Sequence, residues 1–244
     1  MSKIAIVTGG TRGIGEGIVV KLAQMGYNVT INYVSDSSMK RAENLIEKIK
    51  NEYNIECISF RADVADYAAC KQMTQATIDK FGQIDVLVNN AGAATALSFL
   101  ELTPEQYNRT IAVDLLGNMN CCHTVMPSMV QSKSGCIINI SSIAGQLGYP
   151  ENADYCASKA GIHGLTRGLA AEFAGSNIRV NAIAPGMILT DLVREHSDIA
   201  SFEKNILLKR LGEVEDIADC VEYIIGASYV TGCVFPVNGG VYMN

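Results

Sequence analysis

The chain has 244 residues, of which 48% are hydrophobic and 18% are charged, a composition that excludes an intrinsically disordered protein. Its formal net charge of −6 argues against nucleic acid and anionic membranes as main partners. No apolar run approaches the ~20 residues of a membrane-spanning helix, and the N-terminus lacks a basic region with a cleavage site. We therefore expect a cytoplasmic protein.

Short β-branched runs alternate with longer amphipathic segments along the whole sequence. The runs that we expect to be strands are residues 3–8, 28–33, 56–60, 84–89, 136–141, 178–184 and 233–237. Strands that alternate with helices are typical of βαβ units in a parallel sheet, and no linker or internal repeat interrupts residues 1–244. The sequence predicts one α/β domain, doubly wound, with a mostly parallel seven-stranded sheet and helices on both faces.

The first predicted strand is followed by a glycine-rich turn, VTGGTRGIGEG, at residues 7–17. In this turn Gly9, Gly13 and Gly15 follow a G-x-x-x-G-x-G spacing, and Thr11 adds a hydroxyl donor. Glycines let the backbone approach a pyrophosphate, which then meets free N–H groups at the positive end of the helix dipole. The turn is either an ordinary glycine-rich connection or a nucleotide-binding loop. Its position after the first strand of an α/β chain favours the second interpretation.

The end of the second predicted strand should contact the adenine ribose of such a nucleotide. An acidic side chain there suits the 2′-OH of NAD, and a cation suits the 2′-phosphate of NADP. Tyr33 at this strand end is uncharged and Asp36 comes slightly late, whereas Arg12 in the glycine loop is within reach of a 2′-phosphate. The sequence therefore favours NADPH over NADH.

Polar residues also follow the next two predicted strands. Asp63 comes after the third strand, within reach of an adenine amino group, and NNAG ends the fourth at residues 89–92. Carboxamides tie strand ends together, and the small Ala91 and Gly92 leave room for a cofactor. Asn89 has two open interpretations, one structural and one functional.

A serine after the fifth strand and a Y-x-x-x-K sequence complete an ordered set of motifs. The tyrosine and lysine are Tyr155 and Lys159, in DYCASK at residues 154–159, and NISS precedes them. Together with the glycine loop and NNAG, these motifs resemble the short-chain dehydrogenase/reductase family, which has a Rossmann fold. The resemblance runs from Lys3 to the C-terminus. It is strongest to 3-oxoacyl-[acyl-carrier-protein] reductases and acetoacetyl-CoA reductases, as in IRVNAIAPG and VNGGVYM.

The resemblance implies a catalytic set of four residues. Tyr155 would protonate the substrate carbonyl oxygen while hydride reaches the carbon. Lys159, one helical turn away, would favour the phenolate and hold the nicotinamide ribose. Ser142, thirteen residues before the tyrosine, would orient the substrate oxygen, and Ser141 would point the other way. The family's fourth catalytic residue is an asparagine, and Asp114 holds that position here.

An aspartate at position 114 changes the expected chemistry. In the family, the asparagine anchors a water that relays protons to the lysine, and an aspartate would hold this water only as an acceptor. An ionised Asp114 would raise the pKa of Lys159 and disfavour the Tyr155 phenolate. We therefore expect an upward-shifted pH optimum or slower turnover. A protonated or outward-facing Asp114 is the alternative.

The resemblance also assigns a cofactor site at the expected strand ends. Its residues are Gly9, Thr11, Arg12, Gly13, Ile14, Gly15, Tyr33, Asp63, Val64, Asn90, Ala91, Gly92, Tyr155, Lys159, Pro185, Gly186, Ile188 and Thr190. Pro185, Gly186 and Ile188 would line the nicotinamide, and Thr190 would contact its carboxamide or the phosphates. Residues 189–208 would form a mobile substrate lid.

The expected function is NADPH-dependent reduction of a 3-oxoacyl thioester, on acyl carrier protein or CoA, by a homotetramer. The match to carrier-protein docking is incomplete, because one expected basic position is Lys133 but the other is Ser176. Glu151 and Asp154 would make the substrate mouth more acidic than in the family. One alternative is a reductase of another alcohol–ketone pair, such as a sugar, polyol or steroid. Another is a cofactor-binding protein with little turnover because of Asp114.

Histidine and cysteine residues show no metal-site spacing. His123, His163 and His196 are widely separated, and none of the eight cysteines forms C-x-x-C. We expect no catalytic metal, structural or solvated histidines, and reduced thiols that are mostly buried.

Overall fold

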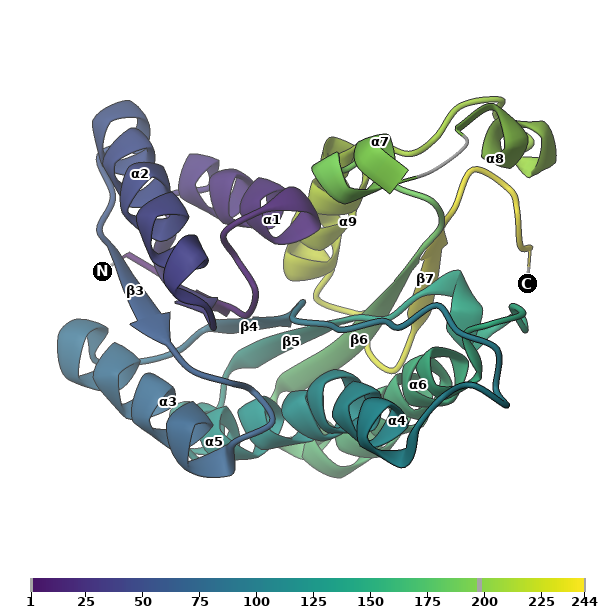
Figure 1. Ribbon diagram of the computed structural model, residues 1–244. Helices are drawn as coiled ribbons and strands as arrows, with labels where there is room; N and C mark the ends of the chain where they lie inside the picture. Colours follow the sequence, from purple (N-terminus) through teal and green to yellow (C-terminus); the bar gives the residue numbers. More distant parts are fainter. Residues whose placement is uncertain (1, 197–198, 244) are drawn as a thin grey trace.

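The structure is a computed structural model that describes residues 2–196 and 199–243. A single sheet lies between two layers of helices (Figure 1). Its strands are β1 (Ile4–Val7), β2 (Asn28–Tyr33), β3 (Cys57–Arg61), β4 (Val86–Asn89), β5 (Gly135–Ile140), β6 (Ile178–Pro185) and β7 (Val234–Val237). Their order is β3-β2-β1-β4-β5-β6-β7, and every pairing is parallel. The seven predicted strands are confirmed to within two residues, and the sheet is wholly rather than mostly parallel.

Helices cover both faces of this sheet. They are α1 (Gly13–Gln24), α2 (Asp36–Tyr53), α3 (Tyr67–Phe81), α4 (Pro104–Ile111), α5 (Gly117–Ser132), α6 (Ala153–Phe173), α7 (Asp191–His196), α8 (Ile199–Asn205) and α9 (Val214–Gly226). Shorter turns are the π-helical η1 (Ala112–Leu116) and the 3-10 turns η2 (Ile143–Gly145) and η3 (Ala174–Ser176). In Figure 1, α1, α2 and α9 lie above the sheet and α3 to α6 lie below it. Within the described residues, no helix combines the length and apolar character that a bilayer crossing requires.

Each face of the sheet has its own hydrophobic core. On β1, Val7 packs into the core under α1, α2 and α9, whereas its neighbour Ile6 packs into the core under α3 and α5. Successive strand residues point to opposite faces, and both faces of a parallel sheet are covered, so the strands are mostly apolar. The strand order reverses between β1 and β4, and ligands bind at such a switch point beyond the carboxyl ends of the strands.

The predicted lid, residues 189–208, contains α7 and α8, and residues 197–198 lie outside the described part of the chain. Its end packs against the turn that follows β7. The Leu208 N–H donates to the Gly239 carbonyl at 3.1 Å. A Cβ on Gly240, whose φ is +88°, would lie 2.8 Å from Leu207. The lid is thus anchored to the C-terminal segment as well as to β6.

Candidate active site

The glycine loop after β1 is fixed by two asparagines from neighbouring strands. Asn32 on β2 accepts from the Gly9 N–H at 3.2 Å and donates to the Ala62 carbonyl at 2.9 Å. Asn90, just after β4, donates to the carbonyls of Thr8 and Gly9 at 3.0 and 3.1 Å. Asn90 was predicted as a site residue. Asn32 was missed, because a single asparagine within an apolar strand gives no sequence signal.

The loop fits the pyrophosphate of a dinucleotide. Gly9 and Gly13 have φ values of +62° and +53°, which favour glycine, and a Cβ on Gly15 would collide with the Gly9 carbonyl. Arg12 is the N-cap residue of α1, and its side chain makes no capping hydrogen bond. The helix therefore begins without a side-chain cap for its first N–H groups, which is the arrangement that binds phosphate.

The adenine end of the expected site carries two ion pairs. Asp36 pairs with Arg61 at 2.6 Å, so this carboxylate after β2 is engaged by a cation. Asp63 after β3 pairs with Arg109 of α4 at 2.8 Å, while its other oxygen accepts from the Ala65 N–H at 3.0 Å. The side chain of Arg12 is exposed. The end of β2 thus offers no unpaired carboxylate from Asp36, and the exposed cation Arg12 lies in the loop after β1.

Ser142 follows β5, and Tyr155 and Lys159 lie on α6, as the sequence predicted for their positions in the fold. Lys159 is 4% exposed, and its Nζ donates to the Ile140 carbonyl at 3.3 Å and lies 5.3 Å from the centre of the Tyr155 ring. Ser142 caps η2, where its Oγ accepts from the Ala144 N–H at 3.1 Å. The phenol and the ammonium therefore share one face of α6, as i and i+4 residues do.

Asp114 lies on the π-turn η1 and faces the lysine. It is 0% exposed, and its Oδ2 lies 3.1 Å from Lys159 Nζ. Its Oδ1 accepts from the Ala93 N–H at 2.7 Å, and the Asn118 side chain donates to its backbone carbonyl at 2.6 Å. A Cβ on Gly92 would lie 3.6 Å from both the carboxylate and the ammonium. The outward-facing alternative for Asp114 is therefore wrong.

Burial and charge act against each other in this ion pair. Burial is the largest single influence on Lys159 and lowers its pKa, but Tyr155 and Asp114 together outweigh it, so the pKa of Lys159 is raised above its ordinary value. Burial also raises the pKa of Asp114, and the attraction of Lys159 offsets only part of this rise. An aspartate at position 114 was predicted to raise the pKa of Lys159, and the pKa of Lys159 is raised.

A family model of short chain dehydrogenases matches residues 3–200, which is most of the chain. The chain belongs to the short-chain dehydrogenase family. It is 41% identical, over 100% of both chains, to 3-oxoacyl-[acyl-carrier-protein] reductase FabG of Staphylococcus epidermidis. It is 39% identical, over 99% of both chains, to acetoacetyl-CoA reductase of Rhizobium meliloti. The solved structure of ElxO with NADP bound is similar with a TM-score of 0.92, at 30% identity over 99% of both chains. The predicted family and fold are confirmed, and this short-chain dehydrogenase is an oxidoreductase that acts on a CH–OH/C=O pair.

The prediction of an acidic substrate mouth is half wrong. Glu151 is exposed, but Asp154 is 6% exposed, and neither of its carboxylate oxygens has a hydrogen-bond partner within the described residues. Asp154 precedes Tyr155 on α6, so its side chain is turned by about 100° around the helix axis from the tyrosine. The motifs in the sequence do not show that the Asp154 side chain points into the protein interior.

Asn89 has a structural position in this dehydrogenase. It is buried, and its side chain donates to Asn139 Oδ1 at 2.9 Å, while Asn139 donates to Thr166 Oγ1 at 3.0 Å. This buried polar chain joins β4, β5 and α6. It supports the structural interpretation that the sequence left open.

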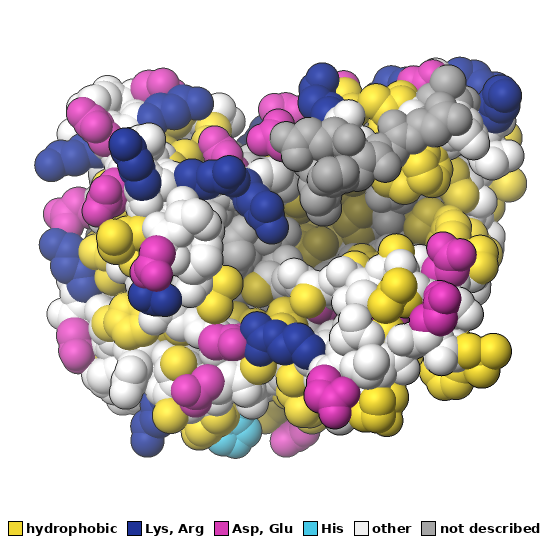
Figure 2. Space-filling view, viewed as in Figure 1, with side chains coloured by type: hydrophobic (Ala, Val, Ile, Leu, Met, Phe, Trp, Pro, Cys, Tyr) yellow, Lys and Arg dark blue, Asp and Glu magenta, His cyan; other side chains and the backbone are white. Residues whose placement is uncertain are grey.

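The surface is hollowed beside the lid region. Figure 2 shows hydrophobic side chains within this hollow and Lys and Arg side chains along its left margin.

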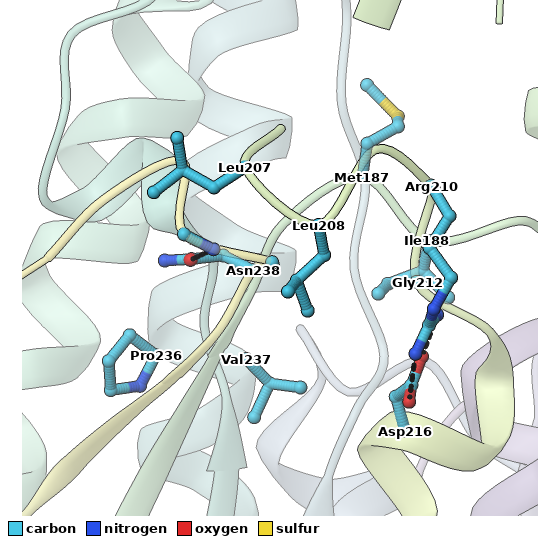
Figure 3. Close-up of a pocket in the computed structure, with 12 residues that line it drawn as sticks. Met187, Ile188, Leu207, Leu208, Arg210, Gly212, Asp216, Pro236, Val237 and Asn238 are labelled. Atoms are coloured by element: carbon cyan, nitrogen blue, oxygen red, sulfur yellow. Dashed lines mark hydrogen bonds and ion pairs between the residues drawn. The ribbon is translucent and has the colours of Figure 1, made fainter. Parts of the chain in front are cut away.

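A pocket of about 440 Å³ lies farther along the strand ends, beyond β6 and β7, and is lined mainly by apolar side chains. Leu207 and Leu208 from the lid lie opposite Pro236 and Val237 (Figure 3). Arg210 and Asp216 pair at one wall at 2.7 Å. Ser142, Tyr155 and Lys159 are not among the lining residues of this pocket.

The remaining histidines and thiols fit structural positions. His123 contacts the Tyr67 hydroxyl at 3.0 Å, His163 is buried, and the side chain of His196 lies outside the described part. Where the chain is described, no group of three or more His, Cys, Asp or Glu residues is close enough to hold a metal ion. All eight cysteines are free, and Cys156 beside Tyr155 is half-buried.

Proposed function

We propose that this dehydrogenase uses NADPH to reduce a 3-oxoacyl thioester to the 3-hydroxyacyl thioester. The observation that carries the proposal is the buried Lys159 ammonium, which lies 5.3 Å from the centre of the Tyr155 ring and 3.1 Å from Asp114. It occurs in a chain about 40% identical over its full length to reductases with these substrates in their names. An ammonium beside a phenol is suited to proton transfer, and the relatives indicate the substrate class.

Each catalytic side chain has one role in this proposal. NADPH, held by the glycine loop at the α1 N-terminus, would supply the hydride. Ser142 donates a hydrogen bond to the substrate carbonyl oxygen, and Tyr155 gives its phenolic proton to that oxygen as the carbon is reduced. Lys159 stabilises the resulting phenolate, and Asp114 holds the ammonium in place. Burial of the pair strengthens both interactions because little water screens them.

The choice of NADPH rests on the end of β2 and on the glycine loop after β1. After β2, the Asp36 carboxylate is engaged by Arg61. In the loop, the exposed Arg12 at the uncapped α1 N-terminus is available for a 2′-phosphate. The solved structures of ElxO contain NADP or NADPH, at 30% and 29% identity to this chain. Both observations support NADPH over NADH.

A tetramer is the assembly that we propose with this activity. The helical segment α4–η1–α5 exposes large apolar side chains, which a second copy of the chain would cover; they are Tyr107, Leu116, Met119 and Val130. Light scattering coupled to gel filtration tests this part. A monomer at micromolar concentration would contradict it.

The substrate class is tested with one panel of ketones. Acetoacetyl-CoA, the same acyl group on acyl carrier protein, and sugar, polyol-derived and steroid ketones are compared as kcat/KM with NADPH and with NADH. The proposal predicts that a thioester with NADPH is preferred by at least ~100-fold. A preferred sugar or steroid would replace the substrate class, and faster turnover with NADH would overturn the role of Arg12.

The buried aspartate supports one second candidate, a cofactor-binding protein with little turnover. The Asp114 carboxylate lies 3.1 Å from the Lys159 ammonium and so competes for it with the phenolate that the forward reaction must form transiently. Tight NADPH binding without turnover of any ketone in the panel, restored by Asp114→Asn, would establish this candidate.

A further inference from the structure

Ser141 and His163 form a buried hydrogen-bonded pair beside the catalytic residues. They are 4% and 7% exposed, and Ser141 Oγ lies 2.8 Å from His163 Nε2. Ser141 immediately precedes Ser142 after β5, and His163 follows Lys159 by one turn of α6. The pair therefore joins the two segments that carry the proposed catalytic side chains.

The hydrogen bonds around Ser141 fix the direction of each proton. Ser141 Oγ donates to the Lys159 backbone carbonyl at 3.0 Å, and a carbonyl only accepts. The single hydroxyl proton is thereby used, so His163 must donate from Nε2–H to the same Oγ. The Ser141 backbone N–H donates to Ile183 of β6 at 2.7 Å. Ser141 is thus held by β6, by the Lys159 backbone and by His163.

A neutral imidazole is consistent with this assignment. Burial, and next the nearby Arg167, lower the pKa of His163 below its ordinary value, so the ring is uncharged at neutral pH. A buried polar ring costs free energy unless it is hydrogen-bonded, and an aliphatic side chain would fill this helix position without that cost. The hydrogen bond between His163 and Ser141 is therefore the feature that explains a histidine at this buried position.

We propose that His163 is a positioning residue of the reductase site, which acts through Ser141 to fix Ser142 relative to Tyr155 and Lys159. The distance between β5 and α6 at this point sets whether the serine and tyrosine hydroxyls meet the same substrate oxygen. Displacement of catalytic groups by about 1 Å costs up to ~100-fold in rate. The inference rests on the proposed function only because the assay uses the substrate class proposed there.

Four single variants and one double variant test the proposal. His163→Leu removes the donor, and His163→Gln keeps an N–H donor at a similar distance from Cα. Ser141→Ala removes the acceptor, and His123→Leu is the control for losing a histidine elsewhere. We measure kcat and KM with acetoacetyl-CoA, the Kd of NADPH by fluorescence, and the melting temperature of each variant.

The Leu and Ala variants should each lower kcat about 10-fold or more, with an unchanged Kd for NADPH. Their combination should lower kcat no further, because both changes break the same link. The Gln variant should recover kcat to within about 3-fold of wild type, and His123→Leu should leave it unchanged. A wild-type kcat in His163→Leu would overturn the proposal. An equal loss of kcat in His163→Leu and His163→Gln, with unchanged melting curves for both, would also overturn it. If His163→Leu does not fold, Ser141→Ala and His163→Gln decide by the same criteria.

A substrate-independent measurement separates this proposal from the proposed function. In ¹⁵N-histidine-labelled protein, NMR should show His163 as the Nε2–H tautomer, and Ser141→Ala should shift that signal. An Nδ1–H tautomer would overturn the assignment. If wild type does not reduce acetoacetyl-CoA, the thioester proposal fails alone, and the variant ratios are measured on whichever panel ketone wild type reduces. Ethyl acetoacetate, a 3-oxo ester without a carrier, is added for this purpose.

Discussion

Replacing Asp114 with asparagine changes the charge of the proposed catalytic centre while keeping its shape. In the Asp114→Asn variant, the carboxamide oxygen could still accept from the Ala93 N–H, which lies 2.7 Å from the carboxylate in wild type. The negative charge 3.1 Å from Lys159 Nζ would be lost. Lys159 would lose one of the two groups that raise its pKa, and the phenolate of Tyr155 would form more easily.

The size of the effect follows from two distances. Placed end to end, the 3.1 Å from Asp114 to Lys159 and the 5.3 Å from Lys159 to the Tyr155 ring keep the carboxylate within about 8 Å of the ring. The phenolate charge resides on the phenolic oxygen, about 3 Å beyond the ring centre, so the two charges lie within ~11 Å of each other; at an effective dielectric constant of ~20 they then interact by at least about 1.5 kcal/mol, which equals roughly 1 pH unit. The pH optimum of Asp114→Asn should therefore be lower than that of wild type by about 1 to 1.5 units.

The assay is a pair of pH–rate profiles at constant ionic strength. Acetoacetyl-CoA reduction and 3-hydroxybutyryl-CoA oxidation are followed in both proteins, from about pH 5.5 to 10. Glu105→Gln, an exposed charge change on the adjacent α4, is the matched control and should leave both profiles in place. Superimposable profiles for Asp114→Asn and wild type, or an upward shift, would refute the reasoning.

Three further changes test other parts of the site. Gly15→Ala places a methyl group against the Gly9 carbonyl, so calorimetry should show NADPH binding weakened at least ~10-fold, and unchanged binding would contradict the packing of the loop. Arg12→Ala should raise the KM for NADPH about 10-fold and leave the KM for NADH unchanged, and an equal change for both would refute 2′-phosphate recognition. As the pH falls below about 6.5, the unfolded chain gains a proton that folded His163 resists, so wild-type stability should fall. Melting curves at pH 7.5 and pH 5.5 should therefore differ more in wild type than in His163→Gln, and an equal difference would contradict the buried neutral ring.

The sequence predicts the sheet and the edge where the site lies because both depend on local patterns. β-branched runs bounded by turns mark the strands, and the glycine spacing after β1 marks the helix end at the proposed cofactor site. Parallel strands then place every strand-end motif on one edge, so residues as far apart as Gly9 and Tyr155 come to the same region.

The parts that the sequence did not predict depend on distances across the fold. Ser141 and His163 are 22 positions apart, and only the packing of α6 on β5 brings them within hydrogen-bonding distance. The burial of Asp154 depends on the rotation of α6 about its axis. The direct contact of Asp114 with Lys159 depends on the π-turn η1, which no residue pattern in that segment indicated.

The proton donor is the central element of the proposed reaction, and it is tested most directly by Tyr155→Phe. The measurement is the loss of dihydronicotinamide absorbance with saturating NADPH and acetoacetyl-CoA, together with the Kd of NADPH. A kcat lower by at least ~100-fold, with a Kd within a few-fold of wild type, is the predicted result. A phenylalanine variant that turns over at the wild-type rate would contradict the role of Tyr155 and the mechanism built on it.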